Sequence, residues 1–395
     1  MKIAILTSGI LPVPATKGGA VENLIDFYLE YNDRHHLHDI TVYSVSDEVA
    51  MHQPALLSDV NHYKFIDVRS FGAKIRKKFR HLLCRDEYYH YTIEYYFEEA
   101  LKHISSETYD MVIIENRPGY GLMIPQKYPA KIVHHIHNDY LNAEVKQAQE
   151  ICDCADSIIT VSEYIRQRVQ TIDNTDKKCK VVLNGIDLNA FNQSTGNKVS
   201  RKDYGLNDDD FVIVYSGRIN PEKGIMELIE AITILKDYNT IKLLVIGSSF
   251  FGNTNHENEF IQQLKTKSIP LGERIIFTGY VDYAQMPEYL KMANIAVIPS
   301  VWDDPFPTTV LEAQAMGLPV ISTRRGGIPE EVTPETAILL DTDNHFVDNL
   351  ANAILDLYNH PEKRKAMSEA AVKHAQQFSK ERYAKSFFDA LESIK

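Results

Sequence analysis

Short apolar runs alternate with helical patterns along most of the chain, and this alternation occurs twice. In the first half the apolar runs predict strands, with helices between them, at 3–6, 40–43, 111–114, 132–135, 157–161 and 181–183. In the second half they predict strands at 212–215, 243–246, 275–277, 295–298, 320–322 and 338–340. Repeated strand–helix units form parallel sheets that helices cover on both faces.

A polar segment separates the two halves. Residues 192–209 are rich in Asn, Ser, Asp, Lys and Gly, which is typical of a linker. Residues 378–395 have the pattern of one amphipathic helix. We therefore predict an α/β fold of two Rossmann-like, doubly wound domains, at 1–195 and 196–375, followed by a helical tail at 376–395.

Composition narrows the class of protein. The chain has 395 residues and a formal net charge of −12, which argues against non-specific nucleic-acid binding. Its four cysteines form no dense disulfide framework, and no apolar run reaches the roughly 20 residues of a membrane span. The N-terminal apolar stretch is too short and too interrupted for a signal peptide. We expect a protein of the reduced cytoplasm.

The segment 300–317 carries the clearest functional signal. It follows the predicted strand at 295–298, and Pro307, Thr308 and Thr309 have the character of a first helical turn. A helix N-terminus at the carboxyl end of a strand binds phosphate readily. Glu312 on the next turn is placed to hold ribose hydroxyls, and Asp304 lies in the loop where a sugar would sit. The segment therefore predicts a nucleotide-sugar site.

The spacing from Asp304 to Glu312 resembles the acid-x7-acid motif of the retaining family 4 glycosyltransferases, which have the two-domain architecture called GT-B. The usual pattern has Glu at both ends, so Asp304 is a departure, and Asp303 is a neighbouring alternative. The resemblance implies two domains facing a cleft and a last helix that crosses back to the first domain. It also implies that Thr308 and Thr309 bind the donor.

A glycine pair follows the first predicted strand. Gly18 and Gly19 let the backbone approach a ligand closely, although a glycine pair by itself is more often a simple tight turn. The G-x-G-x-x-G fingerprint is absent, which argues against NAD. The stretch 11–25 is similar to a bacterial subgroup that includes spore-coat and exopolysaccharide glycosyltransferases. That resemblance implies a glycine loop facing the donor diphosphate.

Two cations follow the first strand of the second half. Asn220 and Pro221 are typical of a helix start, which places Arg218 and Lys223 near the positive end of a helix dipole. A bound anion would relieve the repulsion; the alternative is a solvated basic pair beside Glu222. By the family resemblance, Arg218 and Lys223 hold the β-phosphate and neutralise the leaving diphosphate.

Other predicted site residues lie at further strand ends. His137 ends the strand at 132–135, and the resemblance gives it a contact with the donor sugar or its phosphate. Asn116 and Arg117 occupy the same rim and, with Glu22, are assigned to the acceptor; a capping or surface role is the alternative. By the same resemblance, Tyr280 and Val281 read the nucleobase. No metal site is expected, because 341–343 has the form of a turn and the cysteine pair at 152 and 154 lacks a matching second pair.

The segment 74–85 is a predicted basic amphipathic helix. It carries six Lys or Arg and no acid, with apolar residues at helical spacing. A solvated surface helix is one interpretation; we prefer a patch for anionic lipid heads or a lipid-pyrophosphate acceptor. The tyrosines at 88, 89 and 91 are candidates for sugar stacking or an interface.

These features together predict a retaining, metal-independent hexosyltransferase without a cofactor. It would move a sugar from a nucleotide diphosphate, UDP by family frequency, to a lipid-linked or polymeric glycan of the bacterial surface. The residues assigned to catalysis are Asp304, His137, Arg218 and Lys223. The alternatives are an epimerase or phosphorylase on the same fold, or a non-catalytic glycan-binding surface or coat protein, which the Asp304 departure motivates.

Overall fold

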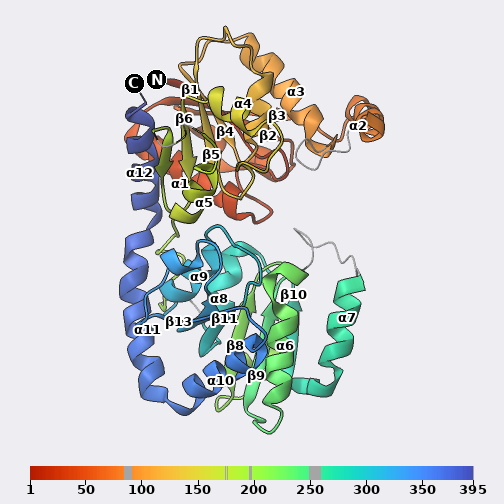
Figure 1. The fold of residues 1–395 in the computed structure, drawn as a ribbon, viewed down its shortest axis with the longest axis vertical. Coiled ribbons are helices and arrows are strands. Elements are labelled where there is room, and N and C mark those ends of the chain that lie inside the picture. The colour runs from red at the N-terminus through yellow and green to blue at the C-terminus, as the bar shows by residue number, and fades with distance from the viewer. Residues whose placement is uncertain (84–90, 174, 176, 195–197, 249–258, 395) are drawn as a thin grey trace. The chain divides into compact units, whose positions relative to one another are not determined.

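Two parallel β-sheets organise the chain (Figure 1). The computed structural model describes residues 1–83, 91–173, 175, 177–194, 198–248 and 259–394. The chain divides into unit 1, Met1–Asn184 with Lys380–Lys395, and unit 2, Gly185–Ser379. The predicted α/β class and the two Rossmann-like domains are confirmed.

Unit 1 contains a seven-stranded sheet of order β3-β2-β1-β4-β5-β6-β7. The strands are β1 (Lys2–Leu6), β2 (Asp39–Val45), β3 (Asn61–Ile66), β4 (Met111–Glu115), β5 (Lys131–Ile136), β6 (Ser157–Thr160) and β7 (Cys179–Val181). The helices are α1 (Ala20–His35), α2 (Phe71–Leu83), α3 (Tyr91–Ser105), α4 (Ala148–Asp153), α5 (Glu163–Val169) and α12 (Lys380–Glu392).

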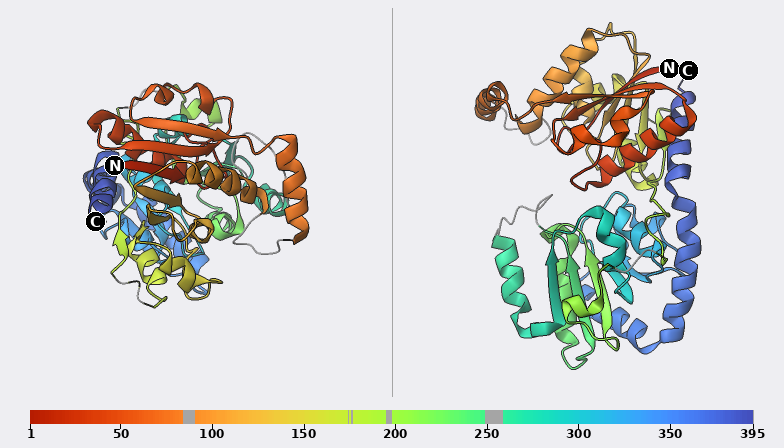
Figure 2. Two further views of the ribbon diagram at one scale, coloured as in Figure 1. Left: turned by 90° about the horizontal axis from the view of Figure 1, so that it is seen from above. Right: turned by 180° about the vertical axis from the view of Figure 1, so that it is seen from behind.

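Helices cover both faces of this sheet (Figure 2). On β1, Ile3 and Ile5 pack in a cluster with α1 and α12, whereas Ala4 and Leu6 pack in another cluster with α3. Successive residues of a strand face opposite sides, so a strand buried on both faces needs an unbroken apolar run. This burial explains why β1 was predictable from its sequence.

The C-terminal helix α12 belongs to unit 1, as the family resemblance implied. Its apolar face packs on α1, where the ring of Phe387 stacks on Tyr28 with centroids 4.2 Å apart. The last part of the chain thereby completes the core of the first unit.

Unit 2 contains a six-stranded sheet of order β10-β9-β8-β11-β12-β13. The strands are β8 (Phe211–Ser216), β9 (Ile241–Ile246), β10 (Ile275–Gly279), β11 (Ile295–Ile298), β12 (Val320–Thr323) and β13 (Ala337–Leu340). The helices are α6 (Ile225–Ile234), α7 (Glu259–Ser268), α8 (Met286–Leu290), α9 (Thr308–Ala315), α10 (Phe346–Asn359) and α11 (Pro361–Ala375). In both sheets the strand order reverses beside the first strand, and ligands bind open α/β sheets at the carboxyl ends of the strands there.

The units divide at other residues than the sequence predicted. The boundaries fall after Asn184 and after Ser379, not after residues 195 and 375. The residues just before the polar segment pack on unit 2: Phe191 is buried with its ring 5.4 Å from Tyr283, and Ile186 forms a bridge with Ser379. Polar composition indicated a linker there, but these few apolar side chains anchor the segment.

Two strand predictions also differ from the structure. β3 was missed because its sequence, NHYKFI, has no continuous apolar run; it is an edge strand whose middle is only partly buried. The last strand of unit 1 spans Cys179–Val181, two residues before its predicted position. None of the helices in the described ranges combines the length and the apolar character needed to cross a bilayer.

Candidate functional site

In unit 2 the loops after β8 and β11 touch each other. Gly224 has φ 70°, and a Cβ atom there would lie 1.8 Å from the carbonyl oxygen of Pro299. Only glycine permits both the left-handed conformation and this close approach. The contact brings the loop that carries Lys223 onto the loop that carries Asp304.

Lys223 and Asp304 form an ion pair where these two loops meet. The Asp304 carboxylate is almost completely buried and also accepts a hydrogen bond of 3.3 Å from Ser300 Oγ. The Lys223 ammonium also lies 5.5 Å from the centre of the Trp302 ring. Two predicted site residues 81 positions apart in sequence are therefore in contact.

Asp303 and Asp304 have different surroundings. Asp303 is partly exposed and pairs with Arg325 at 3.1 Å. The main chain of Asp304 is held by Gly327, whose N–H donates to the Asp304 carbonyl at 2.7 Å. Gly326, with φ 56°, would place a Cβ 2.1 Å from the same carbonyl oxygen. The structure thus distinguishes the two neighbouring acids, and it is Asp304 that meets Lys223.

Glu312 is buried on α9 beside the first helical turn. The hydroxyls of Thr308 and Tyr283 donate hydrogen bonds to its carboxyl group. Burial raises the pKa of Glu312 to about 7, and the two hydroxyls offset only part of that effect. Thr308 and Thr309 are half-buried at the start of the helix, as the sequence predicted.

The other predicted donor residues follow β8 and β10. Arg218 is exposed, and its carbonyl accepts a hydrogen bond of 2.8 Å from the Tyr215 hydroxyl. Tyr280 and Val281 are half-buried directly after β10. The prediction that a helix starts at Pro221 is wrong, because Pro221–Lys223 is a 3-10 turn and α6 begins only after Gly224. Gly224, in the left-handed conformation, separates the 3-10 turn from α6.

In unit 1 the glycine pair precedes α1 as predicted. Gly18 has φ 62°, and α1 begins directly after Gly19. The Glu22 side chain folds back over Gly19, where a Cβ would lie 2.3 Å from Glu22 Oε2. Ser8 Oγ donates to Glu22 Oε1 at 2.9 Å, while burial raises the pKa of Glu22 to about 7. Glu22 is therefore a buried carboxyl at a helix N-terminus.

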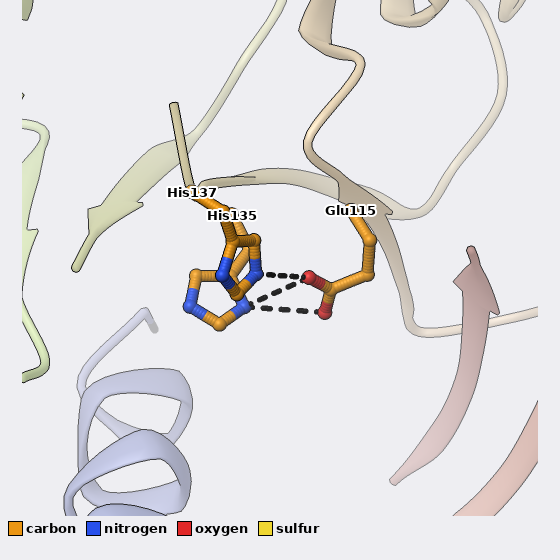
Figure 3. A group of neighbouring side chains, drawn as sticks. All are labelled: Glu115, His135 and His137. Carbon is orange, nitrogen blue, oxygen red and sulfur yellow. Dashed lines mark hydrogen bonds and ion pairs between the residues drawn. The ribbon is translucent and has the colours of Figure 1, made fainter. Parts of the chain in front are cut away.

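His137 lies in a cluster with Glu115 and His135 (Figure 3). His137 Nε2 is 2.8 Å from Glu115 Oε2, and His135 Nδ1 is 3.0 Å from the same oxygen. All three side chains are buried, and the Tyr28 hydroxyl donates to Glu115 Oε1 at 2.9 Å. Burial alone would raise the pKa of Glu115, but the two imidazoles hold it below its usual range.

Asn116 and Arg117 sit beside this cluster. Asn116 has φ 58°, a left-handed conformation that asparagine tolerates, and its Oδ1 accepts the His137 N–H at 3.1 Å. The Arg117 guanidinium lies 5.0 Å from the centre of the Tyr140 ring. Asn116 thus joins the end of β4 to the end of β5.

Comparisons with known proteins identify the family. The model described as "Glycosyl transferases group 1" matches residues 197–374, and the model described as "Glycosyltransferase Family 4" matches residues 34–190. Together these matches cover most of both units. The chain belongs to the family 4 glycosyltransferases with the GT-B fold.

Similar proteins agree with this assignment. YtcC of Bacillus subtilis is 29% identical over 389 residues, which cover 95% of this chain and 88% of that protein. Spore coat protein SA of the same organism is 26% identical, with 99% of both chains covered. The crystal structure of Anabaena Alr3699/HepE with UDP-glucose is 21% identical, covers 100% of both chains and has a TM-score of 0.76. That last likeness shows the shared fold.

The Glu115 cluster is also the place in the described ranges where one Glu and two His bring potential metal-ligand atoms within 4.8 Å of one another. Glu115 was not predicted as a site residue, although an acid at the end of a buried strand indicates a candidate site. Of the acids considered for a metal, Asp341 pairs with Arg324 at 3.5 Å, and Asp343 accepts the His345 N–H at 2.8 Å.

Sequence reasoning also missed Glu331. It follows a 3-10 turn at Ile328–Glu330, is completely buried, and neither carboxyl oxygen has a hydrogen-bond partner. Burial, with a further contribution from the Asp304 charge, raises the pKa of Glu331 well above its ordinary value. Glu331 is therefore a buried carboxyl near Asp304 that lacks a hydrogen-bond partner in the described part of the chain and has a raised pKa.

Proposed function

We propose that this glycosyltransferase is a retaining, metal-independent hexosyltransferase that uses a nucleotide-diphosphate sugar, with UDP as the nucleotide. Its acceptor is a lipid-linked or polymeric glycan of the bacterial surface. The observation that carries the proposal is the Lys223–Asp304 pair beside the strand-order reversal of unit 2. The UDP and UDP-glucose complexes of HepE and the likeness to spore coat protein SA support it.

The charges of unit 2 suit departure of a nucleoside diphosphate. We assign Lys223 and Arg218 to the diphosphate, where fixed cations stabilise the charge that develops as the glycosidic bond breaks. The first turn of α9, with Thr308 and Thr309, offers N–H groups to the phosphates. A bound diphosphate would share Lys223 with Asp304 and leave an Asp304 oxygen for a sugar hydroxyl. Tyr280 and Val281 are assigned to the base.

Glu312 suits the ribose. Its carboxylate has only two hydroxyl donors, so it retains acceptor capacity for the 2′- and 3′-hydroxyls. Glu22, Asn116 and Arg117 are assigned to the acceptor, and His137 to a hydroxyl of the transferred sugar. The roles of Gly18 and Gly19 in donor binding stay predictions.

Thermal unfolding in the presence of UDP-, GDP-, dTDP- and ADP-sugars, with and without EDTA, tests the donor. A ligand at 100 times its dissociation constant adds about 2.7 kcal/mol of stability. We expect a selective shift with a UDP-sugar that persists in EDTA. A shift that EDTA abolishes would contradict metal independence, and no shift with any nucleotide sugar would contradict the donor assignment.

Lys223→Ala tests the role of the cation. We expect a transfer rate lower by about 100-fold, because one preorganised charge on the leaving group is lost. Lys267→Ala is the matched control, since Lys267 forms an exposed ion pair with Glu230 in the same unit. Equal rates for the two variants would remove Lys223 from the mechanism.

We propose that α2 binds an anionic membrane surface. Phe71, Ile75, Phe79 and Leu82 are all more than half exposed, and their spacing places them on one face of the helix. Arg76 and Arg80 instead pair with Glu98 of α3, at 2.7 and 2.6 Å. An apolar stripe on a basic helix suits anionic lipids. Residues 84 and 85 of the predicted helix, and the tyrosines at 88 and 89, lie outside the described residues.

Flotation with vesicles tests this surface. We expect binding to vesicles that contain phosphatidylglycerol but not to pure phosphatidylcholine, and loss of binding in Phe79→Ser/Leu82→Ser. Leu57→Ser is the control, because Leu57 is an exposed leucine elsewhere in unit 1. Binding that survives the double substitution would contradict the role of α2.

A further inference from the structure

Glu115 accepts hydrogen bonds from three side chains. It is the last residue of β4 and is completely buried. Its oxygens meet the Tyr28 hydroxyl at 2.9 Å, His135 Nδ1 at 3.0 Å and His137 Nε2 at 2.8 Å. An ionised carboxylate has no proton to donate, so in each contact the hydrogen belongs to the partner.

We propose that Glu115 is a positioning residue that holds its two histidines in opposite tautomers, His135 protonated on Nδ1 and His137 protonated on Nε2. Figure 3 shows both rings turned toward the same carboxylate, that of His135 from the end of β5 and that of His137 just beyond the strand. The identity of the nitrogen that faces Glu115 differs between the rings, and that difference dictates the tautomers.

The ring nitrogens that do not contact Glu115 face no hydrogen-bond acceptor among the described residues. His135 Nε2 and His137 Nδ1 are buried and have no hydrogen-bond partner. A proton on either nitrogen would leave a buried N–H donor without an acceptor, which costs free energy. Burial lowers the pKa of His137 to about 4, which agrees with a neutral ring. His137 Nδ1 is therefore a bare acceptor.

Neighbouring groups prevent the cluster from rearranging. The Phe387 ring of α12 stacks on Tyr28 at 4.2 Å and lies 5.2 Å from the His135 ring. Asn116 holds the main chain of His137 through its N–H. Packing from the C-terminal helix and a hydrogen bond from the end of β4 thus fix both the carboxylate and the histidines.

The consequence for catalysis rests on the proposed function. A bare Nδ1 on His137 accepts a hydrogen bond from a substrate hydroxyl, whereas the other tautomer would present an N–H donor. Glu115 touches no substrate in this scheme and acts only through His137. Loss of a carboxylate that sets a histidine tautomer lowers turnover strongly, and here we expect a decrease on the order of 100-fold.

Nuclear magnetic resonance of the full chain labelled with ¹⁵N-histidine tests the tautomers directly. In the wild type we expect a bare Nδ1 in the signals of His137 and a bare Nε2 in those of His135, each assigned by the signals lost in His137→Asn and His135→Asn. In Glu115→Leu neither ring keeps an acceptor, so nothing holds the two tautomers in place and we expect at least one ring to change its tautomer. Tyr28→Phe is the control: it keeps the aromatic stack and the carboxylate, so both tautomers should persist.

Two results would overturn the proposal: a wild-type His137 protonated on Nδ1, or unchanged tautomers in a folded Glu115→Leu. The wild-type spectrum needs no variant, so misfolding of a variant does not remove the test. A zinc titration could give a third contrary result. If the wild type binds zinc tightly, with both histidine signals shifted, and Glu115→Gln abolishes the binding, the three side chains are metal ligands instead.

Kinetics separate this inference from the proposed function. In Glu115→Leu we expect kcat for sugar transfer to fall about 100-fold while KM for the donor stays within about threefold, and in Tyr28→Phe we expect both to stay within about threefold. Equal loss in the two variants would indicate a merely structural role. If no donor supports transfer by the wild type, the proposed function fails, whereas the tautomers in the spectrum still decide the inference.

Discussion

Glu115 of unit 1 and Glu312 of unit 2 occupy related places and behave in opposite ways. Glu115 ends β4, and Glu312 lies on the helix after β11; β4 and β11 are the equivalent strands beside the reversal of order in their sheets. Burial disfavours the charge of both. The two imidazoles keep the pKa of Glu115 low, while two hydroxyls leave that of Glu312 at about 7.

This difference in pKa distinguishes two roles of a buried carboxylate, positioning other residues and binding a ligand. Glu115 has its acceptor capacity used by side chains of its own unit, so it is suited to hold other residues in place. Glu312 lacks donors, and a ribose diol would supply them. The number of donors around a buried acid, more than its burial, therefore distinguishes a positioning residue from a ligand-binding residue.

We expect the largest difference between the two acids in the unfolding free energy that is lost when each carboxylate is removed. Glu115→Leu leaves three buried donors without an acceptor, and we expect a loss of about 3–5 kcal/mol in unfolding free energy at pH 7. Glu312→Leu leaves only two hydroxyls and removes a strained charge, so we expect a change of about 1 kcal/mol. Calorimetry of both variants checks this, and similar losses would break the comparison.

The pH dependence of stability should have opposite signs for the two acids. The pKa of Glu312 is raised in the folded state, so the folded protein binds more protons and its stability falls as pH rises from about 4.5 to about 7, by about 3 kcal/mol at most. The pKa of Glu115 is lowered, so its contribution is present above the ordinary carboxyl pKa and is lost as pH falls. Melting temperatures from pH 4 to 8 measure both.

Variants isolate each contribution to this profile. Glu22 and Asp26 in unit 1 also have their pKa values raised to about 7 by burial, so the wild-type curve alone does not report on Glu312. The difference between the wild type and Glu312→Gln does. A pH-independent difference would show that Glu312 is ionised at its ordinary pKa.

Donor affinity should also follow the charge of Glu312. A ribose diol donates to the ionised carboxylate, so we expect UDP to bind the wild type up to about 10-fold more tightly at pH 8 than at pH 6 relative to Glu312→Gln. The ratio of the two proteins' affinities cancels the titration of the phosphate itself. Isothermal titration calorimetry measures it, and a constant ratio would count against ribose binding by Glu312.

Glu331 extends the comparison to an acid with no donor at all. Because neither oxygen has a partner, Glu331→Met should raise the unfolding free energy by about 1 kcal/mol at pH 7, with a larger gain at higher pH. Chemical denaturation checks this. A destabilised variant would indicate that the carboxyl is hydrogen-bonded in solution, for example to a buried water.

The fold was predictable where the signal is local. Nearly all strands have apolar runs because both faces of the sheets are covered, and only the partly polar edge strand β3 was missed. The pairing of Asp304 with Glu312 was also predictable from local sequence, because one loop and the helix that follows it carry both residues. The division between units was misplaced because Ile186 and Phe191, two apolar residues just before the polar segment, pack on unit 2.

The sequence by itself determined the two doubly wound sheets, the family and the loops that carry Lys223, Asp304 and Glu312. Only the tertiary structure decided what surrounds each acid. Glu115, His135 and Tyr28 come from separate segments, and α12 from the far end of the chain packs over them. Local pattern reports which residues are buried, whereas pKa and tautomer depend on contacts of a few ångströms between distant segments, which no local pattern encodes.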